Sequence, residues 1–371
     1  MGNTLSGKEY NLEDHGQSCR KLFDEYVADP NKFQDLSSKV VAITGTSEKS
    51  IGFHIAEVAV RKNAKVLMLC NRDSKSSAQG TKDLKELAKG CGSPTVIETV
   101  TCDLQDLDSV CSAATQINKI ATKHNGLDVL VCNAGVMALK DLRTKDGYDV
   151  QMQTNQLSHF VLVEGVWKSI VQASKSRGEA RVATHSSSAR DSPGKDLEKD
   201  YFMQSKPGSL GGERSMFSEM LLGFRGPWSR YHQTKLANAN FAMALHDKIA
   251  ASSLKGKIQV SSADPGLATS NLQVTTMSDG GMPSWAAKLL GGNGQSPADG
   301  SLPISMCAFG VNTKSGCFYM PQQQLKGPPI CTVEEGVAVK KGGEKLVVSM
   351  TNRENVWKWC EEALGMKFDI E

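Results

Sequence analysis

The sequence predicts an α/β fold in which helices cover both faces of a doubly wound, parallel β-sheet. Two observations support this prediction. Between residues 39 and 263, short runs rich in β-branched and other apolar residues alternate with longer runs of helical periodicity, which is the pattern of repeated βαβ units. The strand-like runs are also almost continuously apolar, as expected for strands that are buried on both faces of a sheet.

The elements follow one another in a regular order. The first expected strand, KVVAIT at 39–44, is β-branched and ends at Gly45. A helix-like segment follows at 51–63, and a second apolar strand comes next at 65–70. The remaining expected elements are strands at 95–102, 127–135, 181–188 and 257–263, and helices at 77–90, 106–124, about 152–173, around Tyr231, and from 352 onward.

The length of 371 residues, with 39% hydrophobic residues, is enough for a large α/β domain with a full core. We expect a single domain over residues 38–371, after a polar extension at 1–37 that lacks a strong period. Two stretches rich in glycine, serine and proline, 190–230 and 276–300, interrupt the alternation. Long irregular segments in a compact domain are usually lids, binding loops or disorder, so we expect insertions there.

The composition excludes several functional classes. The net charge of +3 is small, and no basic cluster is interleaved with aromatic residues, so nucleic acid is not an expected partner. The ten cysteines are scattered without a CxxC pair, which favours a reduced, cytoplasmic setting and gives no reason to expect a metal site. No apolar run reaches the ~18–20 residues that a membrane-spanning helix needs.

The N-terminal sequence MGNTLS matches the pattern for myristoylation, with Gly2 as the acylated residue and Ser6 in the required place. The alternative is an unmodified start that matches the pattern by chance. One myristoyl chain binds membranes only weakly and reversibly. The sequence therefore predicts, at most, a weak membrane association through Gly2.

Tyr231 and Lys235 are four residues apart in SRYHQTKLANANFAMAL, where apolar residues recur with helical spacing. On a helix, these two side chains share one face. A free tyrosine has a pKa of ~10, and a neighbouring cation lowers it, so this phenol could exchange a proton with a carbonyl or alcohol oxygen. Alone, such a pair is more often part of a solvated helix surface.

A glycine-containing turn, TGTSEKSIGFHIA at 44–56, lies between the first expected strand and helix. A doubly wound fold holds a dinucleotide pyrophosphate at this place. Gly45 permits the tight turn, and Gly52 allows a close approach of the backbone. A strand-to-helix turn with two glycines is common, so this signal is weak by itself.

The end of the second expected strand, LMLCNRD at 67–73, is where such folds read the adenosine ribose. An acidic residue there accepts from the 2′-hydroxyl of NAD, whereas an arginine favours the 2′-phosphate of NADP. Asn71 replaces the acid and Arg72 follows it, while Lys49 adds a second positive charge. Asp73 argues mildly for NAD, and an ordinary charged loop is the alternative.

The order of these motifs resembles the short-chain dehydrogenase/reductase family, from about Lys39 to Phe368. TGTSEKSIG stands in place of the family's TGxxxGxG turn, CNAG in place of its NNAG signature, and DPGLATS in place of its PG-x-x-T segment. The resemblance implies a Rossmann fold. It also implies cofactor-binding roles for Gly45, Ser47, Lys49, Ser50, Ile51, Gly52, Arg72, Asp103, Leu104, Asn133, Ala134, Gly135, Tyr231, Lys235, Pro265, Gly266 and Thr269.

The same resemblance implies a catalytic tetrad. Its members are Asn155 in QTNQLSHF, Ser187 in RVATHSSSAR, Tyr231 and Lys235. Tyr231 would be the general acid or base, Ser187 would bind the reacting oxygen, and Lys235 would lower the pKa of the phenol and hold the nicotinamide ribose. Asn155 would hold a water that connects Lys235 to solvent. Ser186 and Ser188 are the alternatives to Ser187 if the register of the serine run is shifted by one residue.

Within the family, LVCNAGVM, YHQTKLAN and ENVWKWCEEALGMKF are most similar to the retinol dehydrogenase and protochlorophyllide reductase branch. Three departures stand out. The glycine turn has one extra residue, with Ser50 in place of the middle glycine. Asp264 replaces a histidine, where it could bind a polar substrate group or face water. The insertion at 190–230 separates the serine from the tyrosine.

We therefore expect an oxidoreductase that uses NADP(H) and transfers a hydride to or from a small lipophilic carbonyl or alcohol. One alternative is a membrane-tethered NADPH-binding sensor or scaffold without turnover. A lower alternative is a protochlorophyllide-type double-bond reductase, against which the N-terminus offers no plastid transit sequence. The resemblance also implies a homodimer as one possible assembly. Substrate identity and reaction direction cannot be read from the residues.

Overall fold

The structure, a computed structural model, describes residues 19–192, 194–214, 219, 226–268, 294–334, 336–339 and 342–370. In this part of the chain, eight strands form one sheet in the order β3-β2-β1-β4-β5-β6-β7-β8. Neighbouring strands are parallel, except that β8 runs antiparallel to β7. The strands are β1 Val40–Thr44, β2 Val66–Asn71, β3 Val96–Thr101, β4 Val129–Cys132, β5 Ala180–His185, β6 Ile258–Ala263, β7 Cys317–Pro321 and β8 Pro329–Val333.

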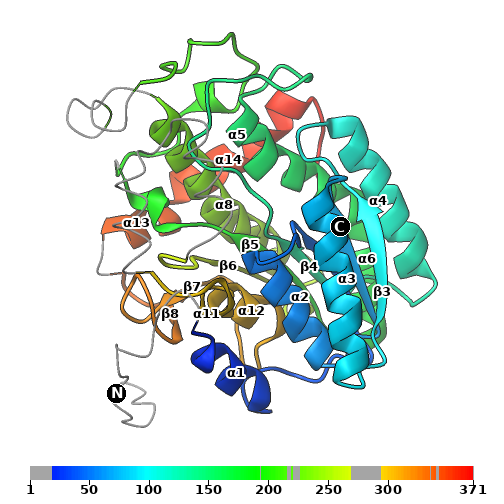
Figure 1. Cartoon of the computed structure of the whole chain (residues 1–371). Helices are drawn as coiled ribbons and strands as arrows, with labels where there is room; N and C mark the ends of the chain where they lie inside the picture. The colour runs from blue at the N-terminus through cyan, green and yellow to red at the C-terminus, as the bar shows by residue number, and fades with distance from the viewer. Residues whose placement is uncertain are drawn as a thin grey trace.

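Helices cover both faces of this sheet (Figure 1). The predicted doubly wound α/β fold is confirmed, and most predicted elements agree with the observed ones to within a few residues. The helical elements are α1 Lys21–Ala28, α2 Ile51–Arg61, α3 Lys75–Gly90, α4 Leu107–Thr122, α5 Val150–Met152, the π-helix η2 Gln153–Leu157, α6 Ser158–Arg177, the 3₁₀ turns η3 Ser188–Asp191 and η4 Lys199–Tyr201, α8 Pro227–Ala250, α11 Pro297–Gly300, α12 Leu302–Phe309, α13 Gly342–Val348 and α14 Met350–Leu364.

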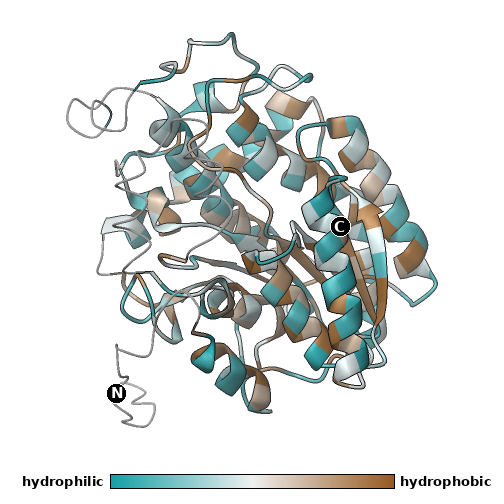
Figure 2. Cartoon of the chain, viewed as in Figure 1, coloured by the Kyte–Doolittle hydropathy of each residue, from teal (hydrophilic) through white to brown (hydrophobic). Residues whose placement is uncertain are grey.

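The alternation of side chains along β1 explains how one sheet serves two cores. Val41 and Ile43 point into a cluster with residues of α1, α2 and α12, whereas Val40 and Ala42 point into a second cluster with residues of α4, α6 and α8. Successive side chains of a strand face opposite sides, so a continuous apolar run is needed to fill both cores. Figure 2 shows the apolar residues concentrated along the strands and on the inner sides of the helices.

Two regions outside the βαβ pattern complete the cores. Helix α1 lies within the stretch that the sequence sets apart as a polar extension, yet Leu22 and Phe23 are buried, and α1 packs beside α11 (Figure 1). At the other end, α14 forms the predicted terminal helix. Its Trp357 stacks on Phe368 with ring centroids 5.0 Å apart and meets Phe160 edge-on at 5.3 Å.

Some sequence predictions concern residues outside the described ranges. Gly2 and Thr269 are among them, as is most of the predicted insertion at 276–300. Among the described residues, no helix has the length and apolar character needed to cross a membrane.

Candidate active site

The predicted site residues follow the carboxyl ends of six parallel strands. Because these ends share one edge of the sheet, residues far apart in the sequence converge there. The chain passes from β1 outward to β3 and then returns to β4 on the other side of β1. Such a reversal leaves a crevice where open α/β sheets bind their ligands. The residues after each strand are Gly45 to Gly52 after β1, Arg72 after β2, Asp103 and Leu104 after β3, Asn133 to Gly135 after β4, Ser187 after β5, and Pro265 and Gly266 after β6.

The turn after β1 requires both of its glycines. Gly45 has a φ of 75°, in the left-handed region. A Cβ on Gly52 would lie 2.1 Å from the carbonyl oxygen of Gly45 and 2.5 Å from Asn133 Nδ2. The start of α2 is therefore in direct contact with the end of β1. This space would be filled by any side chain, so the backbone offers a cradle that fits a pyrophosphate group.

The residues that depart from the family pattern are accommodated within this turn. Lys49 has a positive φ of 55°. This left-handed backbone conformation accommodates the one residue by which the turn is longer than the family pattern. Ser50 is the N-cap of α2: its hydroxyl accepts from the backbone N–H of Phe53 at 3.1 Å and donates to the carbonyl of Ser47 at 2.6 Å. The serine thus performs a capping role that a glycine side chain could not.

Asn133 clamps the turn from the neighbouring strand. Its Nδ2 donates to the carbonyl oxygens of Thr44 at 2.9 Å and Gly45 at 3.2 Å. The backbone N–H groups of Asn133 and Ala134 both donate to Thr44 Oγ1 at 3.0 Å. His185 at the end of β5 donates from Nδ1 to Asn133 Oδ1 at 2.8 Å. These bonds hold β1, β4 and β5 in one fixed arrangement below the crevice.

The expected ribose-recognition region is polar and basic. Asn71 closes the glycine turn, since its Oδ1 accepts from Thr46 N at 2.7 Å and its Nδ2 donates to Thr46 Oγ1 at 2.8 Å. Arg72 and Lys49 are exposed. On the next strand, Asp103 Oδ1 accepts from the backbone N–H of Gln105 at 3.0 Å.

Asn155 lies in the π-helix between α5 and α6, and a π-helical turn often marks a functional site. Its Oδ1 accepts from Val136 N at 2.8 Å, and its Nδ2 donates to Val136 O and to Thr234 Oγ1, both at 2.9 Å. A Cβ on Gly135 would lie 3.0 Å from Asn155 Oδ1 and 3.4 Å from Lys235 Nζ. Asn155, Gly135 and Lys235 are therefore immediate neighbours.

Tyr231 and Lys235 project from α8 toward the end of β5. Both side chains are buried, and Lys235 Nζ donates to the carbonyl oxygen of His185 at 2.9 Å. The Ser187 side chain interacts with the Tyr231 phenol and favours its ionised form. Ser186 instead donates to the carbonyl of Lys235 at 2.7 Å, and Ser188 is exposed. Of the three serines in the register, Ser187 is thus the one that meets the tyrosine.

Burial controls the ionisation of both groups. It raises the pKa of the Tyr231 phenol above its usual value, which the interaction with Ser187 opposes. Burial lowers the pKa of Lys235 to about 8, against the attraction of Asp264. The prediction that the ammonium lowers the pKa of the phenol is wrong for this structure. Lys235 Nζ lies 5.8 Å from the ring centroid and is directed at a backbone carbonyl, so desolvation outweighs its effect.

Asp264 does not face water, so that expectation is wrong, and both of its carboxylate oxygens already have partners within the chain. Its side chain is fully buried, its Oδ1 accepts from Gly266 N at 2.8 Å, and its Oδ2 is 2.9 Å from Arg190 Nη1. Gly266 has a φ of 66°, and a Cβ there would lie 2.5 Å from the carbonyl oxygen of Leu325. Sequence reasoning missed Arg190, because nothing in SSSAR indicates that the arginine turns inward.

A second buried arginine, Arg230, connects the start of α8 with two neighbouring segments of the chain. Arg230 Nε is 3.1 Å from Asp149 Oδ1, and its other nitrogens donate to Gly212 O at 2.8 Å and Leu139 O at 3.1 Å. The start of α8 is thereby tied to the loop after β4 and to the insertion. The Trp228 ring stands edge-on to the Tyr231 ring at 6.1 Å, which places apolar surface beside the reactive phenol.

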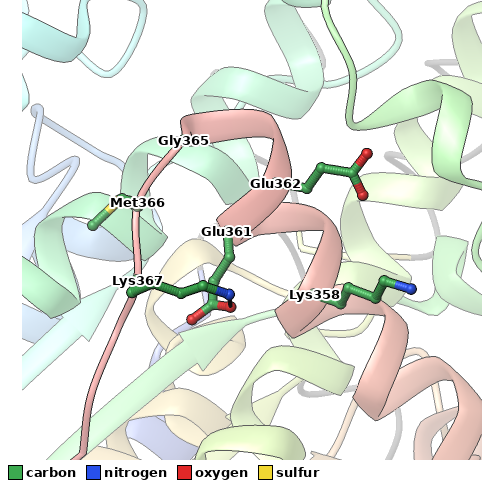
Figure 3. A pocket seen from close by; sticks show the side chains of 6 residues that line it. All are labelled: Lys358, Glu361, Glu362, Gly365, Met366 and Lys367. Atoms are coloured by element: carbon green, nitrogen blue, oxygen red, sulfur yellow. Dashed lines mark hydrogen bonds and ion pairs between the residues drawn. The ribbon is translucent and has the colours of Figure 1, made fainter.

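A pocket at the end of α14 contains none of the predicted site residues (Figure 3). It is lined by Lys358, Glu361, Glu362, Gly365, Met366 and Lys367. Glu361 accepts from Trp357 Nε1 at 3.2 Å and pairs with Lys367 at 2.7 Å. The Glu361 carboxylate is therefore already bonded to its neighbours within α14 and the C-terminal segment. The described residues also contain no group of three or more metal-ligating side chains.

The doubly wound sheet, the glycine cradle at its switch point and the Ser187–Tyr231–Lys235 group define a Rossmann-type α/β protein with the outline of an oxidoreductase. Residues 39–197 match the sequence profile of a family described as short chain dehydrogenase. This match and the relatives below support membership of the short-chain dehydrogenase/reductase family of oxidoreductases.

Individual relatives agree with this assignment. A short-chain dehydrogenase/reductase, drtF, from Aspergillus calidoustus is 27% identical over 348 residues, which cover 90% of this chain and 96% of that protein. The fold is similar to an uncharacterized protein from Mycobacterium Paratuberculosis, with a TM-score of 0.61, 23% identity, and coverage of 92% of this chain and 98% of the other. It is also similar to L-sorbose reductase from Gluconobacter frateurii, solved with NADPH and L-sorbose, with a TM-score of 0.54, 18% identity, and coverage of 79% and 98%.

Proposed function

We propose that this protein is an NADP(H)-dependent oxidoreductase that interconverts a lipophilic carbonyl compound and its alcohol. The observation that carries the proposal is the juxtaposition of Ser187 and the Tyr231 phenol, with Lys235 one turn along the same helix, at the edge of the sheet where the glycine cradle lies. A hydroxyl pair of this kind can bind one oxygen atom and exchange a proton with it.

The residues of the crevice fit a dinucleotide. The turn between Gly45 and Gly52 would hold the pyrophosphate, and Asp103 would contact the adenine. Lys235 would hold the nicotinamide ribose. When bound, the cofactor supplies or accepts the hydride, and this chain's own residues provide orientation and proton transfer.

In the reducing direction, the Tyr231 phenol donates its proton to the substrate oxygen, and Ser187 donates a hydrogen bond to that oxygen as negative charge develops on it. Oxidation reverses both roles. The raised pKa of the buried phenol favours the protonated form that reduction requires. Trp228 beside Tyr231 supports an apolar substrate, as the resemblance to the retinol dehydrogenase branch implies.

The test of the proposed role is Tyr231→Phe. General acid catalysis contributes about 10²–10⁴ in rate, so turnover of all-trans-retinal or of another aldehyde from a broad screen should fall by that factor. Binding of NADPH, measured by calorimetry, should be retained. The control is Tyr148→Phe, which removes a phenol that donates to the carbonyl of Ala363. Undiminished turnover in Tyr231→Phe would refute the role of the tyrosine.

NADP(H) is favoured over NAD(H) because Arg72 and Lys49, which follow β2 and β1, are exposed and could bind a 2′-phosphate. Asn71 stands in place of the acidic residue that NAD prefers, and its side chain already bonds Thr46 in the glycine turn. A charge-assisted hydrogen bond contributes about 1.5–3 kcal/mol, which is about 10- to 150-fold in affinity. Arg72→Ala should weaken NADPH by this factor and leave NADH unchanged in calorimetric titrations. Lys89→Ala, at the far end of α3, is the matched control. Equal affinity of the parent protein for both cofactors would contradict the choice.

The alternative of an NADPH-binding sensor without turnover depended on the altered glycine turn. The capping role of Ser50 and the positive φ of Lys49 make this turn well formed, which favours the enzyme. Myristoylation of Gly2 stays a prediction, for which mass spectrometry of protein made in a eukaryotic host is the measurement.

A further inference from the structure

Arg190 and Asp264 form a buried ion pair next to the proposed catalytic groups. Arg190 lies in η3, three residues after Ser187, and Asp264 directly follows β6. Arg190 Nη1 donates to Asp264 Oδ2 at 2.9 Å and to the carbonyl oxygen of Ser187 at 3.0 Å. The two side chains are 1% and 0% exposed. One guanidinium nitrogen therefore joins the serine turn to the end of β6.

Each partner is also held from its other side. Asp264 accepts from Gly266 N at 2.8 Å, and its own N–H donates to the carbonyl of Tyr319 at 2.9 Å. The guanidinium of Arg190 stacks over the Phe318 ring at 4.2 Å. The pair thus connects the turns that follow β5 and β6 with the adjacent strand β7.

Stability alone is a poor reason for such a pair. Two charges removed from water pay a desolvation penalty that their attraction offsets only in part, and apolar side chains of similar volume are often as stabilising. A role in fixing position and charge is the better explanation here, because both charges contact segments that carry proposed reactive groups.

The charged groups around Asp264 and Arg190 show which reactive side chains the pair can influence. The carboxylate of Asp264 raises the pKa of Lys235 and of Tyr231, both on α8. Arg190 is paired with that carboxylate and has two further acidic neighbours: Asp191 in η3 at 3.4 Å and Glu344 on α13 at 4.0 Å. On the α8 side, His232 Nδ1 bonds the carbonyl of Ala189 at 2.8 Å.

We propose that Arg190 and Asp264 are positioning residues that act through Ser187, Tyr231 and Lys235. Arg190 fixes the backbone of Ser187, and so the direction of its hydroxyl, while it offsets the negative charge that Asp264 directs at the tyrosine and the lysine. This inference rests on the proposed function for its catalytic consequence, but its electrostatic part is a property of the protein without substrate or cofactor.

The first experiment follows Lys235 directly, by NMR titration of ¹³C-labelled lysine side chains, with Lys235→Arg to assign the resonance. Arg190→Met removes the counter-charge, so the lone carboxylate should move the midpoint of Lys235 to higher pH. Asp264→Asn removes the carboxylate and should move that midpoint to lower pH. A merely structural pair would give no opposed shifts.

The matched control is Arg181→Met. Arg181 is also buried, pairs with Glu179 and donates to Gly310 O at 2.8 Å, but lies at the other end of β5. It should leave the Lys235 midpoint in place. If Arg190→Met does not fold, Asp264→Asn and Arg190→Lys test the proposal instead. Asp264→Asn should lower the Lys235 midpoint, and Arg190→Lys should keep it near that of the parent protein. Shifts in the same direction for Arg190→Met and Asp264→Asn, or no shift in Asp264→Asn, would overturn the proposal.

A second experiment measures turnover of all-trans-retinal with NADPH. A displaced reactive group lowers the rate by up to about 100-fold, so Arg190→Met should reduce kcat by about 10- to 100-fold with little change in NADPH affinity, and Arg190→Lys should recover part of it. If the parent protein shows no turnover in any screen, the proposed function fails, while the lysine titration still tests the pair.

Discussion

At the scale of single residues, the site depends on small groups that leave space and on buried polar groups that have defined partners. Gly45, Gly52 and Gly135 leave the backbone of the crevice bare, and added Cβ atoms there would meet neighbouring atoms at 2.8, 2.1 and 3.0 Å. Asn133 then donates to the carbonyl oxygens of Thr44 and Gly45. The crevice is therefore preorganised by contacts within the chain.

Gly52→Ala tests this preorganisation. The new Cβ would lie 2.1 Å from Gly45 O, so the turn must move away from the position that fits a pyrophosphate. Overpacking of this kind costs about 1–3 kcal/mol, and the affinity for NADPH should fall about 5- to 150-fold in calorimetric titrations. Gly90→Ala is the control, because nothing lies within 4 Å of its added Cβ. Unchanged NADPH affinity in Gly52→Ala would contradict the cradle.

At the scale of elements, buried charges hold the irregular segments in place around α8. Asp149 caps α5, since its Oδ2 accepts from Gln151 N and Met152 N at 3.1 Å, and its Oδ1 faces Arg230. Arg143 donates to Ser205 O at 2.8 Å. Backbone carbonyls of the described part of the insertion thus accept hydrogen bonds from Arg143, in the loop after β4, and from Arg230, at the start of α8. These bonds fix the position of the insertion close to Tyr231.

Arg230→Met tests the contribution of the Arg230–Asp149 pair to stability. Removal of one member of a buried pair leaves the other charge uncompensated, which costs about 3–5 kcal/mol. The free energy of unfolding, from urea denaturation at pH 7, should fall by this amount. Arg230→Met with Asp149→Asn should recover part of it, because the amide carries no charge and can still cap α5 through its oxygen. A double variant no more stable than Arg230→Met would show that the charge pair is not the cause.

At the scale of the whole molecule, the sequence predicts the parallel core well, because the core follows from short-range patterns, and the structure brings most of the predicted site residues to one edge of the sheet. Apolar runs and glycine turns mark β1 to β6. The sequence does not predict α1, whose few apolar residues stand in a polar stretch, or the strands β7 and β8. The sequence also does not predict the π-helix around Asn155, which depends on a single extra backbone residue. Nor does it predict that the Arg190 side chain is buried, because its partner Asp264 is distant in the sequence.

Two buried histidines below the crevice, His159 and His185, contribute to the response of the fold to acid. Burial lowers the pKa of His159 to about 4 and that of His185 to about 3. His159 contacts Thr44 Oγ1 at 3.0 Å and the carbonyl of Asn155 at 2.9 Å, so it holds the site together as a neutral ring. In the unfolded chain, histidine titrates at ~6.5.

The folded pKa values are depressed, so the stability that these rings contribute is present above pH ~6.5 and is lost as the pH falls toward 4 and then 3. In that window, these two histidines together bind up to two more protons in the unfolded chain. The free energy of unfolding should then fall by about 1.4 kcal/mol per pH unit for each histidine. Urea denaturation at pH 7.5, 6, 5 and 4.5 measures the slope, in which His159→Gln should remove about half. A variant slope equal to that of the parent protein would show that the acid sensitivity has another origin. Such acid lability would originate at the junction of β1, β4 and β5, so loss of the cofactor crevice and loss of the fold should coincide in one transition.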